Sequence, residues 1–205
     1  MERLFPMFVK LAGRQVLVVG AGAVAEAKIR GLLDTGARLR VVALQANPAV
    51  HEWADADAIG LEERAFAPAD LDDVFLVVAA TSSRELNELI FGEAQRRGIL
   101  CNVVDVPELC DFFYPAVVRR GDLQIAISTA GQSPLLAQRI RKRLEQQFGP
   151  KYAEWVAELG KLRREVLSSD LPAERKRELL RSLTSQDEFN FAICGGSRGE
   201  DEEEQ

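Results

Sequence analysis

Residues 16–33 read VLVVGAGAVAEAKIRGLL, and this stretch decides the fold class of the chain. Four β-favouring apolar residues run into a glycine loop of the form Gly20-x-Gly22-x-x-Ala25, and an amphipathic helical pattern follows. In such a unit the glycines permit a tight turn and let a pyrophosphate approach the backbone, while the N-terminus of the helix attracts the anion. The stretch therefore predicts a dinucleotide site in which Gly20 and Gly22 contact the cofactor.

The alternation of strands and helices continues as far as residue 104. Apolar runs rich in β-branched residues predict strands at 15–19, 38–44, 60–66, 74–81 and 99–104. Helical patterns lie at 24–35 and at 84–97. Strands separated by helices pair in parallel and are covered on both faces. We therefore predict an α/β fold with a Rossmann-like, doubly wound parallel sheet.

The pattern changes after residue 104. Two strands are predicted around Arg120-Gly121-Asp122, and a helix follows with Ser133 as its N-cap and Pro134 at its first position. Two further amphipathic helices are predicted within 151–184. The predicted organisation is a Rossmann-like domain at 1–113, a small α+β region at 114–150, C-terminal helices at 151–194 and an acidic, disordered tail at 195–205.

Composition narrows the classes of function. The formal net charge is −6, but a run of acidic residues at 200–204 accounts for most of it, so the folded part has no basic excess that would indicate nucleic acid. No apolar run approaches the roughly 18 residues of a membrane span, and the N-terminus does not resemble a secretory signal. Three cysteines without a CxxC pair and a single histidine predict no structural metal. We expect a cytoplasmic protein with reduced thiols.

The residues around the predicted adenosine site favour NAD over NADP. In dinucleotide-binding domains the second strand commonly ends in an acidic residue that binds the ribose hydroxyls. Here that strand ends in Ala43-Leu44-Gln45, with no acidic residue before Glu52 and no arginine before Arg64 that could pair with a 2′-phosphate. Gln45 or backbone groups could therefore bind the ribose.

The fourth predicted strand ends in Ala79-Ala80-Thr81-Ser82, where small residues leave space beside a cofactor. The Thr81 hydroxyl could reach a ribose, and Ser82 or Ser83 could instead cap the next helix. Both roles can coexist in this segment.

A carboxylate and a basic segment are the candidates for chemistry on the substrate. Asp105 follows the fifth predicted strand, and ligands of open α/β sheets bind outside the carboxyl ends of the strands. Asp105 can there accept a proton as a hydride leaves, although an aspartate after a strand can also simply stabilise a turn. Between residues 119 and 143 there are six basic residues and a single acid, which suits an anionic substrate or a solvated helix face. The hydroxyl-rich turn at 128–133 can bind an anion at a helix N-terminus.

Two long stretches carry a resemblance to a known family. Residues 6–43 read PMFVKLAGRQVLVVGAGAVAEAKIRGLLDTGARLRVVA, and residues 101–145 read CNVVDVPELCDFFYPAVVRRGDLQIAISTAGQSPLLAQRIRKRLE. With the glycine loop, the NVVD stretch and the FxxPAxxxRGxLxIAISTxGxSPxLA stretch in this order, the chain resembles the precorrin-2 dehydrogenase module of sirohaem synthases. The resemblance covers roughly residues 3–150.

The resemblance implies an oxidoreductase that uses NAD to convert precorrin-2 to sirohydrochlorin in sirohaem biosynthesis, and a hairpin region that builds an intertwined homodimer. Thr129 falls on a site position that is a serine in some relatives. The expected site comprises Asp105 for catalysis, Gly20, Gly22, Ala23, Val24, Leu44, Gln45 and Thr81 for NAD, and Ser128, Thr129, Gly131, Ser133, Arg119 and Arg120 for the tetrapyrrole.

Two alternatives stay open. Some relatives also insert iron into sirohydrochlorin with the same aspartate, so one alternative is a bifunctional dehydrogenase and ferrochelatase. The other is a non-catalytic module that binds NAD and changes shape, which would need the glycine loop but neither Asp105 nor the turn at 128–133. The presence of all three features favours the enzyme.

Overall fold

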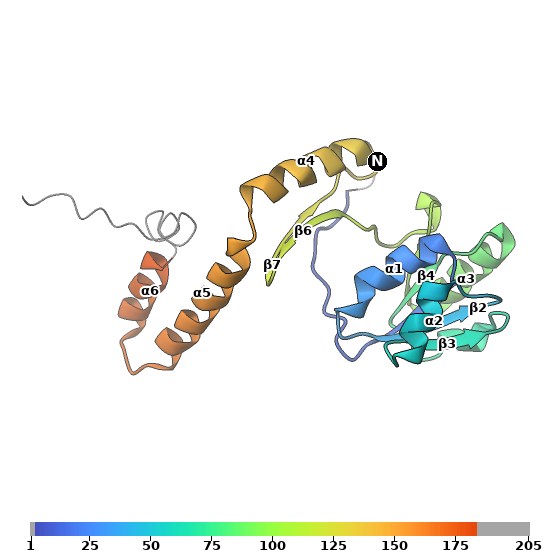
Figure 1. Ribbon diagram of the computed structural model, residues 1–205, viewed down its shortest axis with the longest axis horizontal. Coiled ribbons are helices and arrows are strands. Elements are labelled where there is room, and N and C mark those ends of the chain that lie inside the picture. Colours follow the sequence, from blue (N-terminus) through green and yellow to red (C-terminus); the bar gives the residue numbers. More distant parts are fainter. Residues whose placement is uncertain (1–2, 184–205) are drawn as a thin grey trace, which may run out of the picture. The chain divides into compact units, whose positions relative to one another are not determined.

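Two units make up the part of the chain that the computed structural model describes, residues 3–183 (Figure 1). Residues 5–114 form the sheet unit, and residues 115–183, with residues 3 and 4, form the hairpin unit. The tail predicted at 195–205 and the last part of the helical region predicted at 151–194 lie outside the described residues. Within the described range, no helix is long and apolar enough to cross a membrane.

The sheet unit is built around the strand that precedes the glycine loop. This strand, β1 (Gln15–Val19), lies in the middle of a five-stranded sheet with the order β3-β2-β1-β4-β5, in which all neighbours are parallel. Because the order runs outward from β1 in both directions, the sheet has a topological switch point between β1 and β4, where ligands of such folds bind. This topology confirms the predicted doubly wound α/β fold. The other strands are β2 (Arg38–Ala43), β3 (Gly60–Glu63), β4 (Leu76–Ala79) and β5 (Leu100–Val103).

Both faces of the sheet are buried. Side chains alternate along a strand, so Val16 and Val18 of β1 face one hydrophobic core while Leu17 and Val19 face the other. Helices α1 and α2 pack on the first core, and α3 packs on the second with a short 3₁₀ turn (Figure 1). A sheet covered on both sides needs apolar residues at consecutive positions, which explains the VLVV run. These elements are α1 (Ala23–Leu33), α2 (Pro48–Asp55), α3 (Arg84–Arg97) and η1 (Pro68–Leu71).

Helix α2 departs from the sequence prediction, which placed no helix between the second and third strands. The Asn47 side chain accepts a hydrogen bond from the Val50 N–H at 3.0 Å, and Pro48 occupies the first helical position. Both residue types favour helix starts at these positions. The helix has only eight residues, with Val50 as its one buried side chain, so its apolar periodicity is too short to reveal it.

The hairpin unit contains a two-stranded antiparallel sheet and three helices. Gly121, with a φ of +56°, lies in the turn between the strands, where a left-handed backbone favours glycine. Helix α4 packs against the hairpin, and α5 packs against α6 (Figure 1). Few side chains of this unit are buried apolar residues, namely Val118, Ala137 and Tyr152. The elements are β6 (Ala116–Arg120), β7 (Leu123–Ile127), α4 (Pro134–Gln147), α5 (Lys151–Ser168) and α6 (Ala173–Ser182).

Candidate functional site

The glycine loop connects β1 to α1 at the switch point of the sheet. Gly20 has a φ of +106°, and a Cβ added there would lie 2.3 Å from the Ala80 carbonyl oxygen, so only glycine fits between the ends of β1 and β4. A Cβ added at Gly22 would meet no atom within 4 Å. Gly22 is the N-cap of α1, and no side chain caps the first turn of that helix. Because the backbone N–H groups of this turn have no side-chain cap and Gly22 leaves room beside them, these residues fit a bound pyrophosphate.

The loop after β2 lies against the glycine loop. The Asn47 N–H donates a hydrogen bond to the Ala21 carbonyl at 3.1 Å, and the Asn47 side chain donates to Glu26 of α1 at 2.8 Å. These bonds hold the segment that contains Leu44 and Gln45 beside the start of α1. Both residues are exposed, and Leu44 retains 76% of its accessible surface. An exposed leucine at this edge offers an apolar surface to an adenosine group.

The loop after β4 carries Thr81, which has a buried partner on α3 that sequence reasoning missed. The Thr81 hydroxyl donates to the Asn87 side-chain oxygen at 2.8 Å, and the Asn87 amide donates back to the Thr81 carbonyl at 3.1 Å. A hydroxyl held in this way can still accept a hydrogen bond from a ribose hydroxyl. Ser83, rather than Ser82, caps α3 by accepting the Leu86 N–H. An amide on the buried face of the helix at 84–97 was the available signal for Asn87.

Asp105 lies in a left-handed turn at the same edge of the sheet. The Val106 N–H donates to the Val103 carbonyl at 3.2 Å, and Asp105 lies within this turn with a φ of +62°. The Val104 N–H donates to the Ala79 carbonyl at 2.9 Å, which joins this turn to the end of β4. Aspartate adopts this left-handed conformation more readily than most residues, and Asp57 and Asp73 adopt it too, so the turn fixes the direction of the Asp105 side chain. The sheet unit therefore brings Asp105, Thr81 and the glycine loop to one edge.

Cys110 contacts the backbone of the Asp105 turn. Its thiol lies 3.1 Å from the Val103 carbonyl oxygen and 3.2 Å from the Val106 carbonyl oxygen, so its single proton can be donated to the carbonyl on either side of Asp105. Burial raises the pKa of the Cys110 thiol, which keeps the donor proton on sulfur. The Asn102 side chain donates to the Cys110 sulfur at 3.3 Å. Sequence reasoning could not have found this role, because the contacts join a residue to carbonyls four and seven positions earlier.

The hydroxyl-rich turn predicted at 128–133 lies in the hairpin unit, immediately before α4. Its three hydroxyl oxygens each accept a backbone N–H: Ser128 from Ala130, Thr129 from Ser133, and Ser133 from Leu136, at 3.1 to 3.3 Å. A hydroxyl that accepts from the backbone keeps its own proton to donate to an anion. Gly131 has a φ of +79°, and a Cβ added there would meet no atom within 4 Å. The turn is therefore ordered by its own bonds and open on one side.

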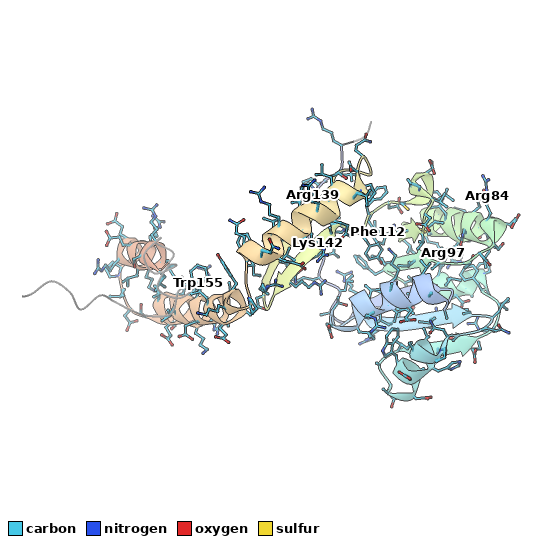
Figure 2. All side chains as sticks on the ribbon, turned by 45° about the horizontal axis from the view of Figure 1, so that its top comes forward. Arg84, Arg97, Phe112, Arg139, Lys142 and Trp155 are labelled. Atoms are coloured by element: carbon cyan, nitrogen blue, oxygen red, sulfur yellow. The ribbon has the colours of Figure 1, made fainter. Side chains whose placement is uncertain are left out.

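The predicted pair Arg119 and Arg120 have different surroundings. The Arg120 guanidinium donates to the carbonyls of Phe148 at 2.8 Å, Glu145 at 3.1 Å and Arg119 at 2.8 Å, so it caps the C-terminus of α4. Arg119 is exposed. Other cations of the basic segment come from α4, including Arg139 and Lys142 (Figure 2). Arg120 has its donors occupied by the backbone, whereas Arg119 is available to a ligand.

Metal-ligating side chains do not cluster in the part of the chain that the structure describes. Among residues 3–183, no group of three histidine, cysteine, aspartate or glutamate side chains could hold a metal ion. Cys101 and Cys110 are both free thiols, and burial raises the pKa of Cys101 to about 12.

Two family models match the chain. The model described as "Putative NAD(P)-binding" matches residues 7–116, which indicates a nicotinamide dinucleotide as the cofactor of the sheet unit. The model described as "Sirohaem biosynthesis protein central" matches residues 120–147, which include the hydroxyl-rich turn.

Similar proteins with curated names are sirohaem synthases. A siroheme synthase of Ectopseudomonas mendocina (strain ymp) is 41% identical over 200 residues, which cover 98% of this chain and 43% of the relative. Siroheme synthase 1 of Aeromonas salmonicida (strain A449) is 37% identical over 193 residues, or 94% of this chain and 41% of that protein. The chain thus spans about two fifths of the length of these relatives.

A solved structure is similar to this chain over nearly the whole length of both chains. The protein described as SirC, precorrin-2 dehydrogenase, has 29% sequence identity and a TM-score of 0.78. The match covers 93% of this chain and 92% of that one. The match therefore spans both the sheet unit and the hairpin unit.

Proposed function

We propose that the chain is an NAD-dependent dehydrogenase that oxidises precorrin-2 to sirohydrochlorin in sirohaem biosynthesis. The chain belongs to the NAD(P)-binding family whose model matches residues 7–116. The observation that carries this proposal is the Asp105 carboxylate, held in a left-handed turn at the sheet edge that also carries the glycine loop. The similarity to SirC, precorrin-2 dehydrogenase, over 93% of the chain supports the choice of substrate.

The reaction removes a hydride and a proton from the substrate, and bound NAD supplies the hydride acceptor. The N–H groups of the first turn of α1 would hold the pyrophosphate, since nothing within the described chain caps them with a side chain. The Thr81 hydroxyl, oriented by Asn87, would accept a hydrogen bond from a ribose hydroxyl. Ala23, Val24, Leu44 and Gln45 would line the adenosine side. Asp105 accepts the proton, and the Cys110 thiol fixes the turn that presents its carboxylate.

The substrate carries many carboxylates, and the hairpin unit offers groups that suit them. Ser128, Thr129 and Ser133 keep hydroxyl protons free to donate, and they lie at the N-terminus of a 14-residue helix. The open side of Gly131 leaves room for a carboxylate, and exposed Arg119 adds a positive charge. We leave Arg120 out of this set, because its donors are bonded to carbonyls at the end of α4.

The protein acts as a homodimer in this proposal. An isolated two-stranded hairpin is marginally stable in water, and the hairpin unit buries few apolar side chains of its own. Leu135 on α4 is 84% exposed, and its neighbour Leu136 is also exposed. Apolar side chains on such a surface suit a second copy of the chain.

The cytoplasm is the location that suits the thiols. Cys110 needs its proton to donate to the Asp105 turn, and a reducing compartment keeps cysteine in the thiol form.

The test replaces Asp105 by alanine and, as a matched variant, by asparagine, which tolerates a left-handed backbone. Turnover of precorrin-2 with NAD, followed through NADH absorbance, should fall by about 10²- to 10⁴-fold in both variants, because each lacks the carboxylate that accepts the proton. NAD affinity, measured by calorimetry, should stay within about threefold of the unmodified chain, since Asp105 does not hold the pyrophosphate. Full turnover by either variant would remove Asp105 from the mechanism. An unmodified chain that binds NAD without oxidising precorrin-2 would refute the dehydrogenase.

A further inference from the structure

The carboxylate that is missing from the end of β2 is supplied by the neighbouring strand. Residues 44–51, which follow β2, contain no acidic residue. Strand β3 pairs with β2 in parallel, and in this register Ala43, the last residue of β2, lies opposite Glu63, the last residue of β3. The two strands therefore end together, and the side chain of Glu63 begins at the edge where the ribose of a dinucleotide lies.

Glu63 is bonded to the loop that lies against the glycine loop. Its Oε1 atom accepts the Ala46 N–H at 3.1 Å. The next residue, Asn47, donates its own N–H to the Ala21 carbonyl at 3.1 Å. Two consecutive residues thus connect the Glu63 carboxylate to the turn that holds the pyrophosphate.

One oxygen of the Glu63 carboxylate is free to accept a hydrogen bond from a ligand. Its side chain is 44% exposed, and its second oxygen, Oε2, has no hydrogen-bond partner among the described residues. His51 Nε2 lies 3.7 Å from Oε1, on the oxygen that already accepts from Ala46. One carboxylate oxygen is therefore left to accept a ribose hydroxyl.

The arginines near this edge are occupied by a different carboxylate. Asp70, whose side chain is only 5% exposed, binds Arg64 at 2.6 Å and Arg40 at 3.2 Å. Arg64 also pairs with Glu62 at 2.7 Å, and these hydrogen bonds raise the pKa of Arg64 above its usual value. Glu62 and Glu63 are successive strand residues, so their side chains leave opposite faces of the sheet. Neither arginine is left to neutralise a 2′-phosphate.

We propose that Glu63 is the residue that sets the preference of this site for NAD over NADP: one carboxylate oxygen orders the loop after β2, and the other accepts a ribose hydroxyl and repels a 2′-phosphate. This inference rests on the dinucleotide site of the proposed function and adds the residue that selects the cofactor. The physical basis is like-charge repulsion at short range, which neither Arg40 nor Arg64 is free to compensate.

The experiment measures the affinities of NAD and of NADP for the full chain by titration calorimetry at low salt. In Glu63→Gln the one side-chain oxygen can still accept the Ala46 N–H, while the oxygen that accepts the ribose hydroxyl becomes an NH2 group and the charge is lost. NAD should therefore bind more weakly and NADP more tightly, so that the ratio of the NAD and NADP affinities falls by at least about tenfold. Glu63→Lys should tighten NADP further, because it replaces repulsion by attraction.

Asp34→Asn is the matched control. Asp34 is the exposed C-cap of α1, at the opposite edge of the sheet, so this variant removes the same charge without changing the ratio of the two affinities. An unchanged ratio in Glu63→Gln, or an equal change in Asp34→Asn, would overturn the inference. NAD binding with the expected variant effects but without oxidation of precorrin-2 would leave the inference standing and refute the proposed dehydrogenase. A chain that binds neither nucleotide would refute both.

Discussion

The sheet unit and the hairpin unit differ in how they obtain their stability. The sheet unit has a hydrophobic core on each face of its sheet, and several side chains of β1 and β4 are fully buried. The hairpin unit has a two-stranded sheet, three buried apolar side chains within the described residues, and exposed leucines on α4. The sheet unit thus buries its apolar side chains in two cores of its own, whereas the hairpin unit buries few apolar side chains within the described residues.

The largest loss of stability in the sheet unit should come from Gly20→Ala. A Cβ there would lie 2.3 Å from the Ala80 carbonyl oxygen, so the central strands must move apart, and the φ of +106° adds strain. We expect the free energy of unfolding of the sheet unit to fall by more than about 3 kcal/mol in urea denaturation. Gly31→Ala is the control, because its added Cβ meets no atom within 4 Å inside α1, and it should stabilise by about 0.5 to 1 kcal/mol. Equal effects of the two variants would contradict a framework that is tightly packed at the switch point.

A smaller loss of stability in the sheet unit should follow Asp70→Asn, which removes the buried carboxylate between Arg40 and Arg64. Loss of the buried carboxylate leaves Arg40 and Arg64 with Glu62 as their remaining carboxylate partner, which should lower the free energy of unfolding by about 1 to 3 kcal/mol at neutral pH. The hydrogen bond from Arg64 holds the pKa of Asp70 below its ordinary value of 3.8, so this stabilisation is present above that pH and is lost as the pH falls through the lower pKa of the folded state. Urea titrations from pH 6 to pH 2 should show the unmodified chain approaching the variant in acid. A constant difference across this range would show that the charge on Asp70 is not the cause.

The smallest effect on the sheet unit should come from Leu135→Glu in the hairpin unit. The unfolding free energy of the sheet unit should change by less than about 0.5 kcal/mol, because the substituted side chain is exposed and lies in the other unit. In sedimentation velocity, however, the unmodified chain should run as a dimer and the variant as a monomer, since a charge in an apolar interface is unfavourable. Leu89→Glu, on exposed Leu89 of α3, should leave the dimer intact. A monomeric unmodified chain would contradict the proposed homodimer, and a dimeric Leu135→Glu variant would contradict the placement of Leu135 in its interface.

Local sequence patterns determined the framework of the sheet unit. Strands buried on both faces need unbroken apolar runs, so VLVV and LVVA could be recognised directly. The same alternation of strands and helices placed the glycine loop after β1 and Asp105 after β5. Because parallel strands end at one edge of the sheet, the two lie at the same edge. The short helix α2 escaped prediction because eight residues with one buried side chain give little periodicity.

The sequence by itself therefore determined the fold class, the glycine loop and the edge at which Asp105 lies, because each depends on residues close together in the chain. Only the tertiary structure decided which side chains are free to bind a ligand. Arg120 is occupied by carbonyls at 145 and 148, Arg64 by Asp70, and Glu63 is left with one oxygen unpaired beside the loop after β2. The physical reason is that hydrogen bonds and ion pairs between distant segments form only when folding brings those segments together, and no local periodicity encodes them.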